Sequence, residues 1–190
     1  MDLSPLDIRL VVIAVVVILC IAGFSWLYWR RRKTAALRTK FGSEYNRAVL
    51  VHGSKRIAEA KLADREKRVE KLTLRDLDSF EHERFEKRWE DVQARFVDSP
   101  KGAVMEADDL VSSLMKARGY PVADFDQRAN DISVDHPKVV ENYRAAHETT
   151  MRVGRSEAST DELRAAMIHY RALYEELMQV PPPVVLKMGT

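Results

Sequence analysis

Five histidines are the residues of this chain best suited to bind a metal ion or to move a proton: His52, His82, His136, His147 and His169. Metal sites inside helical bundles place their ligands one turn apart, as in the Glu-x-x-His pairs of di-iron proteins. None of the five belongs to such a pair or to a His-x-x-x-His pair, and Asp78 with His82 gives a single pair one turn apart. The sequence therefore predicts no metal site and no cofactor.

Three carboxylates, Glu106, Asp108 and Asp109, lie close together in a helical stretch that begins at Pro100. Two carboxylates buried together can serve as a catalytic acid and base. The buried face of this helix is marked by Leu110 and Val111, and the aspartates are expected to one side of it. Acidic residues also suit the first turns of a helix because of the helix dipole. We therefore expect solvated carboxylates and no catalytic pair.

A third candidate site combines residues of the last two long helices, namely Tyr143, His147, His169 and Tyr170. If they line one groove between these helices, they form a polar pocket that could bind a small ligand. The alternative is a stacked aromatic core whose hydroxyls are satisfied by hydrogen bonds. The pocket is the only feature of the sequence that supports an enzyme or a small-ligand sensor.

Other kinds of functional site are disfavoured by composition. There is no Gly-x-Ser-x-Gly motif, and seven glycines among 190 residues leave little room for a phosphate-binding loop. The formal net charge is +2 and no basic stretch is interleaved with aromatic residues, so no nucleic-acid partner is expected. The single cysteine, Cys20, excludes an internal disulfide framework.

The elements that would position these residues all have helical periodicity. Residues 55–71 hold eleven charged residues among seventeen and predict a solvated helical arm or a coiled coil. Ser99-Pro100 and the Ser159…Glu162 capping box predict two helix starts, and Gly119 predicts a helix end. Phe85, Trp89 and Phe96 recur at helical spacing on one face of a helix over 76–97 and predict a core or interaction face. Residues 120–134 are expected to form a connector with one helical turn.

The N-terminal part contains an uncharged run of twenty residues, Leu10 to Trp29. A helix of this length spans about 30 Å, the thickness of a bilayer's hydrocarbon core, so the run predicts a transmembrane helix. Aromatic and basic residues at its end predict a membrane interface: Trp26, Tyr28, Trp29, Arg30, Arg31, Arg32 and Lys33. A buried core helix and a cleaved signal peptide are the alternatives, and the acidic N-terminus argues against the signal peptide.

Charge predicts the orientation of this segment. Four cations follow it, whereas only Arg9 precedes it. The positive-inside rule then places the C-terminal domain in the cytoplasm and residues 1–9 outside. The lipid bilayer is accordingly an expected partner.

Residues 88–120, RWEDVQARFVDSPKGAVMEADDLVSSLMKARGY, resemble a segment of an uncharacterised group of bacterial helical proteins. Residues 159–174 are similar to the C-terminal helix of the same group. The resemblance implies an all-helical module and implies no activity.

Together these observations predict an all-α chain with five parts. They are a short tail (1–9), a transmembrane helix (10–29), a basic junction and charged arm (30–73), a compact bundle of about four helices (74–179), and a disordered Pro-rich tail (180–190). The expected function is that of a non-enzymatic interaction or scaffold module at the cell membrane, which binds an unknown protein or a second copy of itself. The alternative is a membrane-bound enzyme or sensor that uses the polar pocket.

Overall fold

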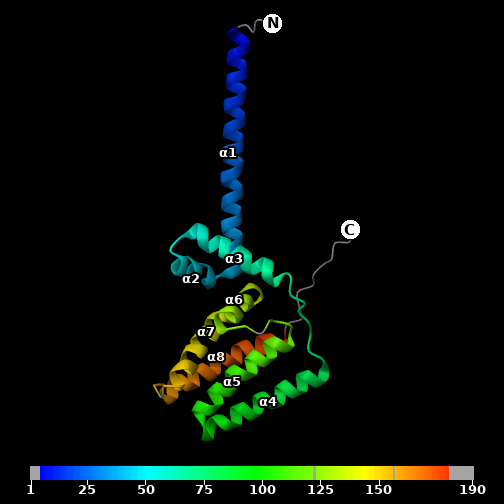
Figure 1. Cartoon of the computed structure of the whole chain (residues 1–190), viewed down its shortest axis with the longest axis vertical. Coiled ribbons are helices and arrows are strands. Elements are labelled where there is room, and N and C mark those ends of the chain that lie inside the picture. Colours follow the sequence, from blue (N-terminus) through cyan, green and yellow to red (C-terminus); the bar gives the residue numbers. More distant parts are fainter. Residues whose placement is uncertain (1–4, 122, 156, 180–190) are drawn as a thin grey trace. The chain divides into compact units, whose positions relative to one another are not determined.

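The structure, a computed structural model, describes the backbone of residues 5–121, 123–155 and 157–179 and the side chains of these residues apart from 5–14, 16 and 30. This part of the chain forms eight helices and no strand (Figure 1), which confirms the all-α prediction. It divides into two compact units, residues 1–40 and 41–190. The predicted tail over 180–190 and the first four residues lie outside the described residues.

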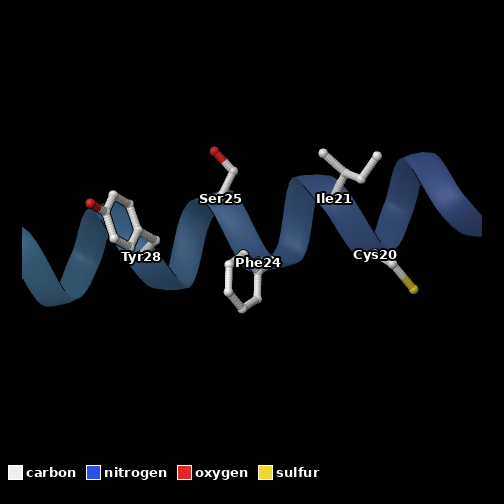
Figure 2. A pocket seen from close by; sticks show the side chains of 5 residues that line it. All are labelled: Cys20, Ile21, Phe24, Ser25 and Tyr28. Atoms are coloured by element: carbon white, nitrogen blue, oxygen red, sulfur yellow. The ribbon is translucent and has the colours of Figure 1, made fainter.

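The first unit contains all of α1 (Pro5–Phe41) except its last residue, and this single helix continues through the predicted boundary at residue 30. Its large apolar side chains from Val15 to Trp29 are half exposed or more where they are described. Cys20, Ile21, Phe24, Ser25 and Tyr28 line an open hollow on this helix. In Figure 2 these side chains stand on opposite sides of the ribbon, so the hollow is an open part of the helix surface.

The prediction of a transmembrane helix over 10–29 is contradicted by the structure. None of the helices, over the residues described, is both long and apolar enough to cross a membrane. Residues 10–14, 16 and 30 lie outside the residues whose side chains are described. The predicted cytoplasmic orientation, which was derived from the charges that flank this segment, stays a prediction.

The second unit begins with a hairpin of α2 (Ser43–His52) and α3 (Lys55–Val69), which pack against each other. The chain breaks before and between them at Gly42 and Gly53, whose φ angles of 51° and 63° favour glycine. Tyr45, Leu62 and other apolar residues are buried on the inner faces. The charged arm predicted as a solvated rod is therefore a folded hairpin, because its thin apolar stripe finds a partner in α2.

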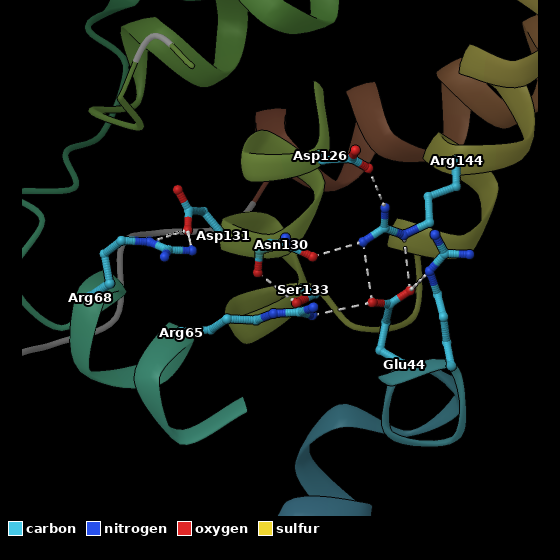
Figure 3. Close-up of polar contacts among 9 residues, drawn as sticks. Glu44, Arg65, Arg68, Asp126, Asn130, Asp131, Ser133 and Arg144 are labelled. Carbon is cyan, nitrogen blue, oxygen red and sulfur yellow. Dashed lines mark hydrogen bonds and ion pairs between the residues drawn. The ribbon is translucent and has the colours of Figure 1, made fainter. Parts of the chain in front are cut away.

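A buried carboxylate joins this hairpin to the rest of the unit (Figure 3). Glu44 on α2 is 2% exposed and accepts hydrogen bonds from Nε and Nη2 of Arg144 on α7 (Val140–Val153), at 3.1 and 3.3 Å. Arg65 on α3 donates to the same carboxylate at 3.5 Å, and Arg47 lies 3.8 Å from it. Arg144 also donates to Asn130 on α6 (Phe125–Asp135) at 3.1 Å. We call these five residues the Glu44 cluster, and it connects four helices.

A second charged contact lies beside the Glu44 cluster. Arg68 on α3 donates to Oδ1 of Asp131 on α6 from Nε at 2.8 Å and from Nη2 at 2.5 Å. Asp131 is fully buried, so this charge-assisted contact offsets part of the cost of removing its carboxylate from water. Burial also lowers the pKa of Arg65 in the neighbouring cluster. The hairpin is thus attached to the bundle largely through charged groups.

The bundle consists of α4 (Ser79–Asp98), α5 (Pro100–Ala117), α6 (Phe125–Asp135), α7 (Val140–Val153) and α8 (Thr160–Gln179). α5 packs against α4, α7 and α8, while α7 also packs against α8 and α6. The buried face of α5 contains Leu110, Val111 and Leu114, as its periodicity predicts. The helical bundle is therefore confirmed, with one more helix than expected.

The additional helix is α6, which replaces the predicted connector. Asp124 caps it, because its side chain accepts a hydrogen bond from the backbone of Gln127 at 2.8 Å. Ala129 and Ile132 are buried against the core. An eleven-residue helix forms here because both a cap and an apolar face are present.

Helix starts and ends follow local chemistry. The Ser159…Glu162 capping box is confirmed, with Glu162 accepting from the Ser159 backbone at 2.8 Å and the Glu162 amide donating to the Ser159 hydroxyl at 3.3 Å. α4 is capped by Asp78, which forms a capping box with Glu81. Gly119 follows α5 with φ 96°, and its Cα lies against the chain at Thr73. That close approach requires a residue without a Cβ.

Replacing Glu44 by glutamine should lower the free energy of unfolding by about 3 kcal/mol. The substitution leaves the mostly buried guanidinium of Arg65 without its counter-charge and leaves Arg144 only the exposed carboxylate of Asp126, 3.7 Å away. Urea unfolding followed by circular dichroism measures the change. The exposed Asp64→Asn substitution on α3 is the matched control, and an equal effect of the two substitutions would contradict the prediction.

Gly119→Ala should destabilise the protein by more than about 2 kcal/mol, since a left-handed φ is costly for alanine and the new Cβ would lie 2.4 Å from the Thr73 carbonyl oxygen. Gly154→Ala is the control, because Gly154 has φ −58° and its nearest neighbouring atom would be 3.6 Å away. Thermal unfolding of both variants tests the difference, and similar melting temperatures would contradict it.

Candidate functional site

The second unit has an accessible groove between α4 and α8. Trp89, Gln93 and Phe96 line it from α4, and Arg164, Met167, Ile168 and Arg171 line it from α8. Its volume is about 280 Å³. We call these seven residues the α4–α8 groove. It exists because α5 lies between α4 and α8 and packs against both (Figure 1).

The floor of the groove is aromatic. Trp89 is almost fully buried and stacks on Tyr174 of α8, with ring centroids 4.7 Å apart and planes inclined by 12°. Burial, followed by the nearby carboxylates of Glu86 and Glu90, raises the pKa of Tyr174 to about 12. The stacked pair therefore forms a neutral, rigid base for the groove at ordinary pH.

The outer wall and the rim are accessible to a partner. Ile168 is a large apolar residue that lines the groove and is 62% exposed. Arg164 donates to Asp161 at 2.6 Å and Arg171 donates to Glu175 at 2.7 Å, each within α8. All four side chains are exposed, and exposed ion pairs of this kind contribute little to stability. Both arginines can therefore change partner at low cost.

The predicted aromatic face is divided between core and groove. Phe85 is buried in the core, and the guanidinium of Arg84 lies 5.3 Å from the centre of its ring. Trp89 belongs both to the core and to the groove floor, and half-buried Phe96 packs against the core while lining the groove. Two of the three residues therefore contribute to an accessible surface.

The predicted polar pocket is brought together only in part. Tyr143 and Tyr170 are fully buried with ring centroids 6.4 Å apart. The Tyr143 hydroxyl accepts from Arg128 Nε at 3.2 Å, and the Tyr170 hydroxyl lies 2.8 Å from the Thr150 hydroxyl. His169 is half-buried and directly precedes Tyr170 in the helix. Its side chain therefore points about 100° away from that of Tyr170 around the helix axis.

Asp108 occupies the place in this cluster that was predicted for His169. Its Oδ2 lies 3.4 Å from Nδ1 of His147 without forming a hydrogen bond, and Phe125 stacks on the imidazole at 3.6 Å. Burial raises the pKa of Tyr170, and the Asp108 charge raises it further. Asp108 follows Val104 by four residues and precedes Val111 by three, which places it on the buried face of α5. This spacing could have predicted that Asp108 lies inside the bundle.

The other candidate acids and histidines do not join this cluster. Glu106 pairs with Arg95 of α4, and Asp109 is exposed. His136 lies 3.0 Å from the carboxylate of Glu176, and His82 lies 3.8 Å from that of Glu86. Among the residues that the structure describes, no group of three or more His, Cys, Asp or Glu side chains is placed to hold a metal ion.

The residues predicted to lie at a membrane interface belong to the first unit. Trp26, Tyr28 and Trp29 are exposed on α1, as are Arg31, Arg32 and Lys33, whereas the side chain of Arg30 is not among those described. The Arg32 guanidinium lies 5.1 Å from the centre of the Tyr28 ring, a cation–π contact.

Comparisons of this chain with protein-family models, with curated proteins and with solved structures find no match. The resemblance of residues 88–120 and 159–174 to an uncharacterised helical group stays a prediction.

The stacked Tyr174 gives the folded protein a measurable response to alkali. Burial favours its neutral form, so this stabilisation is present below the pKa of an unfolded tyrosine, about 10, and is lost as pH rises to about 12. Tyr174→Phe should make the urea midpoint fall less steeply with pH over that window. When the folded wild type is titrated with alkali, the tyrosinate absorbance near pH 10 should contain no contribution from Tyr174. If Tyr174→Phe lowers the absorbance rise near pH 10, Tyr174 titrates there and the assignment is wrong.

Proposed function

We propose that the second unit is a non-enzymatic interaction module that binds a partner through the α4–α8 groove. The observation that carries this proposal is the exposure of Ile168 above a rigid aromatic floor. Apolar residues that are accessible, clustered and bordered by charged groups are typical of binding surfaces. Trp89 and the two arginines are also residue types that dominate binding energy at interfaces.

The groove is furthermore suited to binding and not to catalysis. Acid–base catalysis requires a group that exchanges a proton near neutral pH. The charged residues lining the groove are Arg164 and Arg171, and an arginine stays protonated in proteins. The remaining lining side chains supply apolar contact and one amide, from Gln93.

A small-ligand sensor built on the Tyr143–His147–Tyr170 cluster is a second candidate. It is favoured by two buried atoms that lack a hydrogen-bond partner, Oδ1 of Asp108 and Nδ1 of His147. Such atoms in a folded protein call for an explanation, and a bound ligand or water would supply one. The satisfied hydroxyls of both tyrosines favour packing instead, so the groove is the better-supported site.

The proposal predicts that Ile168→Glu abolishes partner binding without unfolding the protein. A carboxylate in an apolar contact should weaken binding at least about tenfold, because it would be desolvated without a counter-charge. Quantitative pull-down of the full chain from its own cells should recover a protein that is lost with Ile168→Glu. Met151→Glu is the matched control, since Met151 is similarly exposed on α7 and does not line the groove.

Circular dichroism must show equal helicity for both variants. If every recovered protein binds the wild type and Ile168→Glu equally, the groove is not the binding surface and the proposal fails.

A further inference from the structure

Building on the proposed function, we propose that the occupant of the α4–α8 groove is an amphipathic α-helix with carboxylates set two turns apart along one edge of its apolar stripe. The carboxylates would pair with Arg164 and Arg171 at the rim. The apolar stripe would cover Ile168 and the aromatic floor.

The spacing of the lining residues points to a helix. Trp89, Gln93 and Phe96 stand at positions i, i+4 and i+7 of α4. On α8 the lining residues stand at i, i+3, i+4 and i+7, from Arg164 to Arg171. Each wall is therefore a ridge of helical period, and the groove between two such ridges accepts the ridge of another helix. Partner helices that bind in this way place their anchors at the same spacing.

The distribution of charge along the groove points to an acidic helix. Arg164 and Arg171 are seven residues apart, which places their Cα atoms about 10.5 Å apart along α8. Carboxylates at i and i+7 of a partner helix have the same separation. A guanidinium binds a carboxylate through two parallel hydrogen bonds, so the pairing is directional as well as electrostatic. A helix with cations at those positions would meet like charge.

The ion pairs that Arg164 and Arg171 form within α8 do not prevent them from pairing with carboxylates of a partner helix. Asp161 and Glu175 lie on α8 itself and are themselves exposed. When a partner helix covers Ile168, it also shields the rim from water and strengthens the new ion pairs relative to the old ones. The arginines then select the partner, while the apolar floor supplies the area.

The test uses a phage-displayed library of helical peptides. Apolar residues are fixed at i, i+3, i+4 and i+7, and the flanking positions are random. The library is selected on the full chain and counter-selected on the Ile168→Glu variant. We expect the groove-dependent peptides to be enriched in Asp and Glu at two flanking positions seven residues apart.

The affinity of the most enriched peptide is then measured by fluorescence anisotropy. The double variant Arg164→Gln with Arg171→Gln should bind it about three- to thirtyfold more weakly, the range expected for two exposed ion pairs. The control Arg56→Gln with Lys61→Gln removes two exposed charges from α3 and should change the affinity less than about twofold.

The outcomes separate this inference from the proposed function. Groove-dependent peptides without acidic enrichment, or with affinities that the arginine variant leaves unchanged, would overturn the acidic partner and leave the interaction module standing. If the pull-down finds an Ile168-dependent protein and the library yields no groove-dependent peptide, the occupant is not a helix and the inference is wrong. A wild-type dimer that Ile168→Glu converts to a monomer would identify a second copy as the occupant and overturn it as well.

Discussion

The packing of α5 between its neighbours is the constraint on which the rest of the bundle depends. Its face from Ala103 to Met115 is almost completely buried, and it contacts α4, α7 and α8. Alanines at 103 and 107 let neighbouring backbones approach closely, while the leucines at 110 and 114 fill the space further along. α4 and α8 both pack against α5. The two helices contact each other through the Trp89–Tyr174 stack, and Trp89 also lines the α4–α8 groove.

Two different kinds of interaction hold the second unit together. The bundle is joined by apolar packing, which is strong and tolerant of small shifts. The α2–α3 hairpin is joined to it by the Glu44 cluster and by the Arg68–Asp131 contact, which are directional. A buried charge is costly without its partner, so these contacts favour one position of the hairpin over any displaced one. Packing therefore supplies the stability of the bundle, and charge specifies where the hairpin sits.

Sequence patterns predict those parts of the fold that local chemistry decides. The starts of α5 and α8 follow from Pro100 and from the Ser159…Glu162 box, and the buried stripe of α5 follows from its period. Glu44 could not be predicted in this way, because a glutamate beside a charged segment normally faces water. Its burial depends on Arg65 and Arg144, which lie 21 and 100 residues further along the chain. The hydropathy of residues 10–29 predicted a transmembrane helix, and the structure does not bear it out over the residues described.

The candidate site shows the same division between local and tertiary information. The spacing of Trp89 and Phe96 reveals an apolar face, but spacing alone does not say which part of that face stays open. That is decided by how far α8 lies from α4, and so by the side chains of α5 between them. The rim charges are likewise unremarkable in sequence, because Arg164 and Arg171 each have an acidic neighbour at helical distance. Ile168 lies between them, is exposed and stands beside the aromatic floor, so an apolar side chain and two cationic groups share one surface. The groove thus combines an aromatic floor, an exposed apolar side chain and two arginines, and an arginine does not exchange its proton near neutral pH.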